Sequence, residues 1–303
     1  MKNETSRREF LKTSVAAACV AGLPASLAAA PEPAPTGRLI KGLVMGMLPE
    51  KLSYAERFKM AADAGFESVE AYTTEDQRVA EEIKKAADAA KIKILSVMNQ
   101  AHWDAPLSSD DPAAIKKSMD GMKTSLDNAK LWGASAVLLV PAVVNAKTPY
   151  NDAWARSQKH IRELIPLAQE RKVIIAVEQV WNKFLLSPRE FAQYVDSFQS
   201  PWVKAYVDVG NMVLFGYPQD WIRTLGKRIV KIHLKDFKVT SKGFSPFTAE
   251  FVNLGDGDVD WPEVRKALAE VGYSGTVTAE LDEGDLAYLT DVSKRIDRLV
   301  LGL

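Results

Sequence analysis

The stretch Val173-Ile174-Ile175-Ala176-Val177-Glu178 decides the fold, because a short β-branched run that ends on a carboxylate is typical of a buried parallel strand. Three later runs have the same form, and they are Val203–Val207 before Asp208, Ile229–Ile232 before His233, and Thr276–Ala279 before Glu280. In α/β folds, chemistry gathers at the carboxyl ends of the strands. We therefore expect two glutamates, an aspartate and an imidazole to converge there.

Strand and helix patterns alternate along the rest of the chain. The expected strands are Gly42–Met47, Ser68–Ala71, Ile92–Met98, Ala134–Val140, Val173–Glu178, Val203–Asp208, Ile229–Leu234 and Thr276–Leu281. The expected helices are Ala55–Ala64, Glu75–Ala90, Ala113–Trp132, Asp152–Glu170, Pro188–Phe198, Gln219–Gly226, Trp261–Val271 and Asp285–Leu301. This alternation predicts an α/β protein with a single (β/α)8 TIM barrel. Met45-Gly46-Met47 after the first strand is not a dinucleotide fingerprint.

The first residues are typical of a targeting segment rather than of a fold. Ser6-Arg7-Arg8-Glu9-Phe10-Leu11-Lys12 precedes a mildly apolar, alanine-rich stretch, as in a twin-arginine export signal. The sequence thus predicts a signal peptide over 1–30 with cleavage near Ala28–Ala30, a linker over 31–40, and a catalytic barrel over 41–303. We expect the Tat translocase as a partner, a periplasmic or otherwise exported location, and no stable membrane insertion.

Composition excludes several classes of function. The chain has 303 residues, 47% of them hydrophobic, and a formal net charge of +0, so no basic field favours nucleic acid as a partner. The one cysteine, Cys19, lies in the predicted signal peptide. Any metal ion must then be held by oxygen and nitrogen ligands. Three carboxylates and one imidazole suit Mn²⁺, our first expectation, and also Mg²⁺, Co²⁺ or Zn²⁺.

Further polar and aromatic side chains are expected at the same end of the barrel as possible substrate contacts. Glu70 would bind a sugar hydroxyl or form a surface salt bridge, and Lys235 would neutralise an anion or form a structural ion pair. His160 lies in the middle of a helix, where we expect it to face solvent. The long segment from Lys235 to Asp260 carries Phe237, Phe244, Phe247 and Phe251 and is a candidate lid. The full set of expected substrate contacts is Glu70, Asn99, His102, Trp103, Trp181, Asn211, Lys235 and Asp236.

Short motifs connect these residues to a known group of enzymes. Asp208-Val209-Gly210-Asn211, His233-Leu234-Lys235-Asp236, Gly255-Asp256-Gly257-Asp258-Val259-Asp260-Trp261 and the strand ends Glu178 and Glu280 resemble the sugar phosphate isomerase/epimerase superfamily. These xylose isomerase-like barrels include ketose 3-epimerases and hydroxypyruvate isomerase. The resemblance implies that Glu178, Asp208, His233 and Glu280 hold one divalent metal ion and that the two glutamates exchange protons with the substrate.

The resemblance leaves several points open. It implies a metal-dependent isomerase or epimerase that acts through an enediolate, and the export signal favours a carbohydrate substrate that is a non-phosphorylated ketose or keto-sugar. A keto-glycoside lyase that works by β-elimination is the alternative enzyme, since the same bases would remove the same acidic proton. A periplasmic sugar-binding barrel without turnover is the alternative from another class. Related barrels are often dimers or tetramers, so a homo-oligomer stays open.

Overall fold

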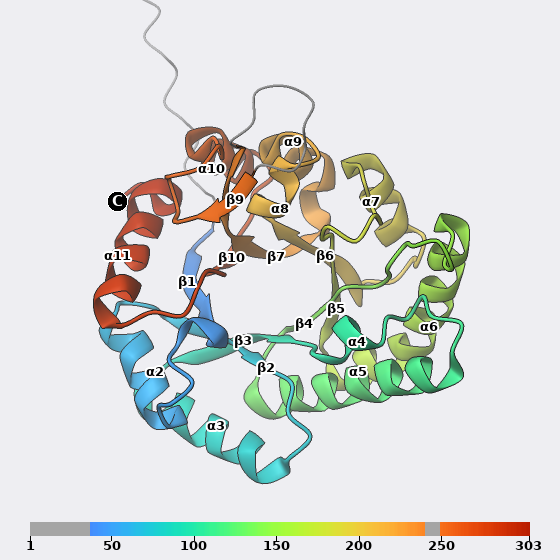
Figure 1. Ribbon diagram of the computed structural model, residues 1–303. Coiled ribbons are helices and arrows are strands. Elements are labelled where there is room, and N and C mark those ends of the chain that lie inside the picture. Colours follow the sequence, from blue (N-terminus) through green and yellow to red (C-terminus); the bar gives the residue numbers. More distant parts are fainter. Residues whose placement is uncertain (1–36, 240–248) are drawn as a thin grey trace, which may run out of the picture. The chain divides into compact units, whose positions relative to one another are not determined.

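Eight parallel strands close into one barrel within the part of the chain that the structure, a computed structural model, describes, which is residues 37–239 and 249–303 (Figure 1). The order around the barrel is β1, β10, β7, β6, β5, β4, β3 and β2. The strands are β1 (Leu39–Val44), β2 (Ser68–Tyr72), β3 (Lys93–Met98), β4 (Ala136–Leu139), β5 (Ile174–Glu178), β6 (Val203–Asp208), β7 (Ile229–Leu234) and β10 (Gly275–Ala279). The predicted barrel is confirmed.

The helices form a ring outside the strands (Figure 1). They are α2 (Tyr54–Asp63), α3 (Gln77–Ala90), α4 (Ala101–Asp104), α5 (Pro112–Trp132), α6 (Tyr150–Arg171), α7 (Pro188–Asp196), α8 (Val209–Val213), α9 (Pro218–Leu225), α10 (Trp261–Glu270) and α11 (Leu286–Ile296), with short turns at Met45–Met47, Gly226–Arg228 and Asp297–Leu301. Local sequence sets their ends. Ser53 and Glu56 form a capping box at the start of α2, and Gly133 ends α5 with a φ of 77°.

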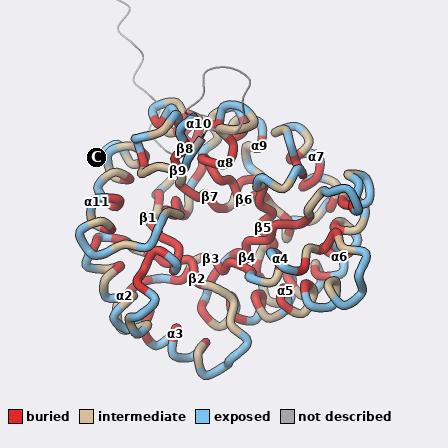
Figure 2. The backbone as a smooth tube through the Cα atoms, in the orientation of Figure 1, coloured by how far each residue is buried: buried red, intermediate tan, exposed pale blue. Residues whose placement is uncertain are grey.

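Burial is greatest on the barrel strands (Figure 2). Apolar side chains fill the layer between strands and helices, while one sector of the barrel interior is polar. A Cβ added at Gly42 would lie 2.6 Å from Ser68 Oγ and 3.1 Å from Thr278 Oγ1, so these hydroxyls meet inside the barrel. Because side chains alternate along a strand, Lys231 points to the same side as His233. Polar side chains therefore lie inside the barrel, directly below the carboxyl ends of the strands.

The structure contains two short helices that the sequence did not predict, α4 and α8, and it differs from the sequence expectations in three further places. β1 begins at Leu39, inside the predicted linker, and the expected strand end at Met45–Met47 is a 3-10 turn. The long segment after β7 contains an antiparallel hairpin of β8 (Asp236–Val239) and β9 (Ala249–Val252). Alternating strand patterns were too short there to reveal a hairpin in advance.

Some predictions fall on residues that are not described. The predicted signal peptide over 1–30 lies outside the described residues, as do Phe244 and Phe247 of the candidate lid. Within the described ranges, every helix falls short of the length or the apolar character that a bilayer span requires.

Candidate metal centre

The four strand-end residues meet at one point. Glu178 ends β5, Asp208 ends β6, His233 lies one residue before the end of β7, and Glu280 follows β10. Neighbouring parallel strands bring these ends together, and Asp208 pairs in register with His233. One ligand atom from each of the four residues lies within 4.8 Å of every other. This spacing allows all four residues to bind one ion.

His233 is held from two sides inside the cluster. Its Nδ1 lies 3.2 Å from Glu178 Oε1 and 2.7 Å from Glu280 Oε2, and its Nε2 lies 3.0 Å from Glu70 Oε1. The imidazole is fully buried. Since Glu70 takes the Nε2 proton, Nδ1 is the nitrogen directed at the other ligands. A carboxylate behind a histidine is the usual way in which proteins orient a metal-binding imidazole.

Glu70 has a different role from either one that we expected. Tyr206 Oη donates a hydrogen bond to Glu70 Oε2 at 2.7 Å, and His233 occupies the other carboxylate oxygen. The side chain is buried, so it forms neither a sugar contact nor a surface salt bridge. The reason is position, because Glu70 points into the barrel interior below the strand ends. It positions His233 instead.

The Asp208-Val209-Gly210-Asn211 motif makes a tight corner after β6. Asp208 Oδ1 accepts a hydrogen bond from the Asn211 backbone N–H at 2.9 Å and so caps α8. A Cβ at Gly210 would lie 2.5 Å from Lys235 Cβ, so only glycine lets the end of β7 pack here. Lys235 Nζ then lies 3.1 Å from Asp208 Oδ2 and 2.9 Å from Glu280 Oε2. Of the two expected roles for Lys235, the structure shows the ion pair.

Burial and charge act differently on the two glutamates. Burial raises the pKa of Glu178 to about 7, against the lowering effect of His233. Burial alone would also raise the pKa of Glu280, but the charges of His233 and Lys235 lower it below its ordinary value. Burial disfavours the charged form of His233, yet Glu280 and Glu70 raise its pKa well above the ordinary value. The cluster therefore contains one carboxyl that can carry a proton near neutral pH and one that stays ionised.

The donor set fits a divalent cation. Asp208 Oδ2 and Glu280 Oε2 are buried and accept no well-oriented hydrogen bond from any residue that the structure describes, although Lys235 Nζ lies within ion-pairing distance of both. Four carboxylates stand against two lysines in and just below the cluster, which leaves a formal balance of −2 when His233 is neutral; they are Glu70, Glu178, Asp208 and Glu280 against Lys231 and Lys235. One divalent ion with oxygen and nitrogen ligands would cancel this balance.

A cavity of about 330 Å³ lies beside the cluster. Five of the residues that we expected at the substrate line it, namely His102, Trp103, Trp181, Asn211 and Lys235. Asn99, in the loop between β3 and α4, is fully buried and does not line the cavity. Its Oδ1 accepts a hydrogen bond from the Ala101 backbone N–H. The strand-end cluster and this cavity together form the candidate site.

Asp236 anchors a loop rather than lining the cavity. Its carboxylate accepts hydrogen bonds from the backbone N–H groups of Phe237, Gly255 and Val259 and from Trp261 Nε1. A Cβ at Gly257 would lie 2.2 Å from Asp236 Oδ1, which explains the glycine in this motif. With its oxygens taken and its side chain fully buried, Asp236 has no room for the substrate contact that we expected.

Sequence reasoning misjudged His160 and missed two interior residues. His160 is 7% exposed rather than solvent-facing, because α6 buries that face together with Ser157 and Ile161. Tyr206 and Lys231 were not singled out, although each stands two residues before a predicted ligand. The period of two along a strand would have placed both inside the barrel.

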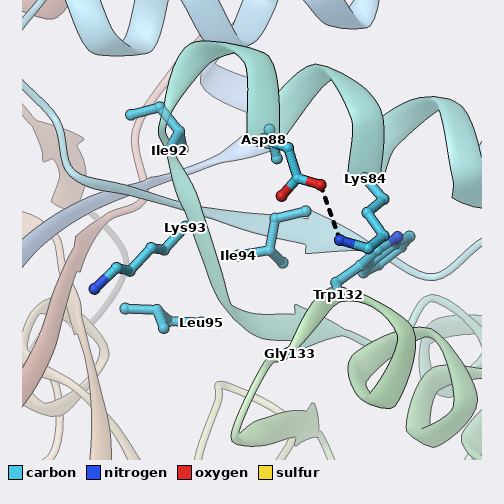
Figure 3. Close-up of a pocket in the computed structure, with 9 residues that line it drawn as sticks. Lys84, Asp88, Ile92, Lys93, Ile94, Leu95, Trp132 and Gly133 are labelled. Atoms are coloured by element: carbon cyan, nitrogen blue, oxygen red, sulfur yellow. Dashed lines mark hydrogen bonds and ion pairs between the residues drawn. The ribbon is translucent and has the colours of Figure 1, made fainter.

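A second cavity, of about 160 Å³, is lined by residues of α3, of β3 and of the end of α5 (Figure 3). Its lining includes Lys93 at the start of β3 and Gly133 at the end of α5. Lys84 Nζ pairs with Asp88 Oδ2 at 2.9 Å, an exposed pair one turn apart on α3. Such pairs contribute little and are common on helix surfaces. The cavity brings no converging set of ligands together, so the candidate site stays at the carboxyl ends of the strands.

Comparison with known proteins agrees with this geometry. A family described as xylose isomerase-like TIM barrels matches residues 58–296. A protein of Escherichia coli (strain K12), SgbU, provisionally named an L-ribulose-5-phosphate 3-epimerase, is 28% identical over 251 residues, covering 79% of this chain and 87% of that protein. A D-psicose 3-epimerase of Enterocloster bolteae is 26% identical over 184 residues, covering 57% of each. Relatives of this chain thus include proteins named as sugar epimerases.

Solved structures share the fold. A zinc-bound IolI protein superposes with a TM-score of 0.73 at 18% identity, covering 87% of this chain and 99% of that one. A 3-keto-D-glucoside 4-epimerase of E. coli gives a TM-score of 0.73 at 12% identity, covering 86% and 100%. The family match over residues 58–296 spans Glu178, Asp208, His233 and Glu280. This chain belongs to the family of xylose isomerase-like TIM barrels.

Proposed function

We propose that this protein is a divalent-metal-dependent sugar epimerase that removes and returns a proton beside a carbonyl group. The observation that carries the proposal is the cluster itself, in which two buried glutamates share one centre with an aspartate and a histidine, all within 4.8 Å. The epimerase relatives and the zinc-bound structural neighbour support the same reading. The metal ion would be held by Glu178, Asp208, His233 and Glu280, with Mn²⁺ the first candidate and Mg²⁺, Co²⁺ or Zn²⁺ as alternatives.

A divalent ion in this site would draw electron density from the substrate's carbonyl and neighbouring hydroxyl, which makes the proton on the carbon between them more acidic. The protein must then supply a base on one face of that carbon and an acid on the other. Of the three carboxyl groups in the cluster, we assign these roles to the two glutamates, Glu178 and Glu280. His233, fixed by Glu70, keeps the spacing between them.

We assign the first proton transfer to Glu178. Burial raises its pKa to about 7 in the site without a metal ion, so its surroundings favour the uptake of a proton, and a bound cation would lower this pKa again and help the proton to leave. The C–H electron pair moves into the substrate as an enediolate. Glu280, which is ionised at rest, takes up a proton from solvent and delivers it to the opposite face of the carbon. Glu178 then releases its proton to solvent, so both carboxyl groups return to their starting states. Proton return to the neighbouring carbon would instead move the carbonyl and make the protein an isomerase.

Deuterium exchange in D₂O tests the proposal. The protein loaded with Mn²⁺ is incubated with a free ketohexose such as D-psicose, and deuterium beside the carbonyl is followed by NMR. We expect exchange and an epimeric product, with a loss of about 100-fold or more in Glu178→Gln. Release of a free aglycone from a 3-keto-glycoside would favour the lyase instead. Tight sugar binding without exchange from any ketose would contradict an enzyme and favour the binding protein.

We also propose that the protein is exported by the twin-arginine route and acts in the periplasm on a non-phosphorylated substrate. Sequencing the amino terminus of protein recovered from the periplasm tests this, with a start near residue 29 or 31 expected. Recovery of the uncleaved chain from the cytoplasm would contradict it.

A further inference from the structure

The cavity beside the metal centre contains a polar group that pairs with nothing in the part of the chain that the structure describes. His102, on α4, is 1% exposed and lines the cavity of about 330 Å³. Its Nε2 is buried and has no hydrogen-bond partner among the described residues. A buried donor left unpaired is costly, so such a group in a cavity wall indicates that a ligand completes it. We therefore expect a ligand in this cavity to form a hydrogen bond with His102 Nε2.

The hydrogen bonding of His102 fixes which nitrogen carries the proton. The backbone N–H of Val140 donates to His102 Nδ1 at 3.3 Å, so Nδ1 must be free of a proton. The proton of the neutral imidazole then sits on Nε2, which acts as a donor. Burial lowers the pKa of His102 to about 3, against the raising effect of Glu280. The group is a neutral N–H donor at physiological pH, suited to a hydroxyl, carbonyl or ether oxygen.

The cavity has little to offer a phosphate group. Lys235 is the cation in its described lining, and this ammonium is already paired with Asp208 and Glu280. Phosphates are normally bound by arginine or lysine, or by backbone amides at a helix start. A neutral imidazole donor does not replace them. The described lining of this cavity therefore suits an uncharged group better than a phosphate.

The cavity wall is aromatic and partly open to solvent. Trp181 stacks on Phe251 with ring centroids 5.0 Å apart and an angle of 11° between the rings. Trp181 Nε1 donates to the Asn211 backbone carbonyl at 2.9 Å, which fixes the indole. Trp103, Trp181 and Phe251 line the cavity and are 54%, 40% and 48% exposed. Clustered exposed aromatic rings mark a surface that a ligand covers, and flat rings pack best against another ring.

From these observations we infer that the substrate is a keto-sugar joined to a second, uncharged ring, and that this ring occupies the aromatic cavity while His102 Nε2–H donates to one of its oxygens or to the glycosidic oxygen. The inference rests on the proposed function, because it takes the reacting sugar to lie over the metal cluster. It names a keto-glycoside as the substrate class, in place of a phosphorylated or free ketose. His102 would be the residue that recognises this class.

Binding, rather than turnover, tests the inference. Three probes are titrated into the Mn²⁺-loaded protein while tryptophan fluorescence is followed, namely 3-keto-glucose, its 6-phosphate, and phenyl 3-keto-β-glucoside. We expect the phenyl glycoside to bind about tenfold more tightly than the free keto-sugar, as stacking and burial of one ring would give. We expect the phosphate to bind no more tightly than the free sugar. Equal affinity for the glycoside and the free sugar, or preference for the phosphate, would overturn the inference.

Variants of His102 separate recognition from folding. His102→Asn can still accept the Val140 N–H but has no donor at the Nε2 position, so glycoside affinity should fall roughly 2- to 10-fold. His102→Gln keeps an N–H at that reach and should retain most of the affinity. His160→Asn, a buried histidine outside the site, is the matched control and should change nothing. Loss in all three variants, or in none, would overturn the role of His102; circular dichroism confirms that each is folded.

The aromatic wall has its own control. Trp181→Ala should remove most of the preference for the phenyl glycoside, whereas Tyr217→Ala, which removes an exposed ring away from the cavity, should leave it intact. The deuterium exchange of a free ketose does not depend on the second ring. If exchange occurs without glycoside preference, the inference fails and the epimerase proposal stands. If glycoside preference is seen but no substrate exchanges, the proposed function fails.

Discussion

Replacing Glu70 with glutamine tests whether the interior of the barrel controls the metal centre. Glu70 Oε1 lies 3.0 Å from His233 Nε2, and both side chains are fully buried. Glutamine keeps the shape and an acceptor oxygen but removes the negative charge. The hydrogen bond then changes from a charge-assisted one to a neutral one, a loss of about 1.5 kcal/mol, so Mn²⁺ affinity should fall about tenfold.

The same change disturbs a neighbouring charge, which needs its own control. Burial lowers the pKa of Lys231 to about 8, and Glu70 counteracts this effect. Without Glu70, Lys231 has less reason to stay charged, and the unfolding free energy should fall. The double variant Glu70→Gln with Lys231→Met removes both charges and should recover stability while Mn²⁺ affinity stays reduced.

Mn²⁺ affinity is measured by competition with a chelator at pH 7.5, and stability by thermal unfolding. Glu67→Gln, an exposed change just before β2, is the matched control and should alter neither quantity. Affinity of Glu70→Gln within twofold of the wild type would refute the role given to Glu70. An equal loss of Mn²⁺ affinity in Lys231→Met alone would also refute the role given to Glu70, because the loss would then come from the general polarity of the barrel interior.

Three further predictions follow from the structure. First, the pKa of His102 is lowered from 6.5 to about 3 in the folded protein, so the unfolded chain binds the proton first as the pH falls. The free energy of unfolding should therefore decrease from about pH 6.5 down to pH 3, by about 2 kcal/mol at pH 5. Chemical denaturation of His102→Asn should show a smaller decrease over the same pH range. Second, the raised pKa of His233 means that a metal ion must displace a proton, so Mn²⁺ affinity should rise about tenfold per pH unit around pH 7, and a flat profile by calorimetry would contradict this. Third, Asp236→Asn turns an acceptor of four hydrogen bonds partly into a donor and should lower the free energy of unfolding by roughly 3 kcal/mol or more. The control Asp260→Asn, at the start of α10, should leave that free energy nearly unchanged because asparagine caps a helix equally well.

The barrel was predictable because its signals are local and repeat. Apolar β-branched runs such as Val173–Val177 recur between helical patterns, and each of the four predicted ligands directly follows such a run. The same repetition brought the ligands to one end, since parallel strands share a direction. The strand-end cluster is thus the part of the site that can be predicted from the order of residues along the chain.

The remaining features depend on which side chains meet in three dimensions. Glu70 was expected at the substrate and Lys231 was not singled out. Only the closed barrel shows that Glu70 is hydrogen-bonded to His233 from inside and that the charge of Lys231 interacts with Glu70. Asp236 looked like a site residue because it follows Lys235, yet its carboxylate turns to the backbone of the loop that ends at Trp261. The pairing of β8 with β9 depended on contacts that short strands do not reveal by themselves.

Metal stoichiometry measured by elemental analysis tests the central claim most directly. The wild-type protein, dialysed against Mn²⁺ and then against metal-free buffer, should retain one ion per chain, and Asp208→Asn and His233→Ala should retain far less while still folding. Unchanged metal content in these two variants would show that the four strand-end side chains do not share an ion.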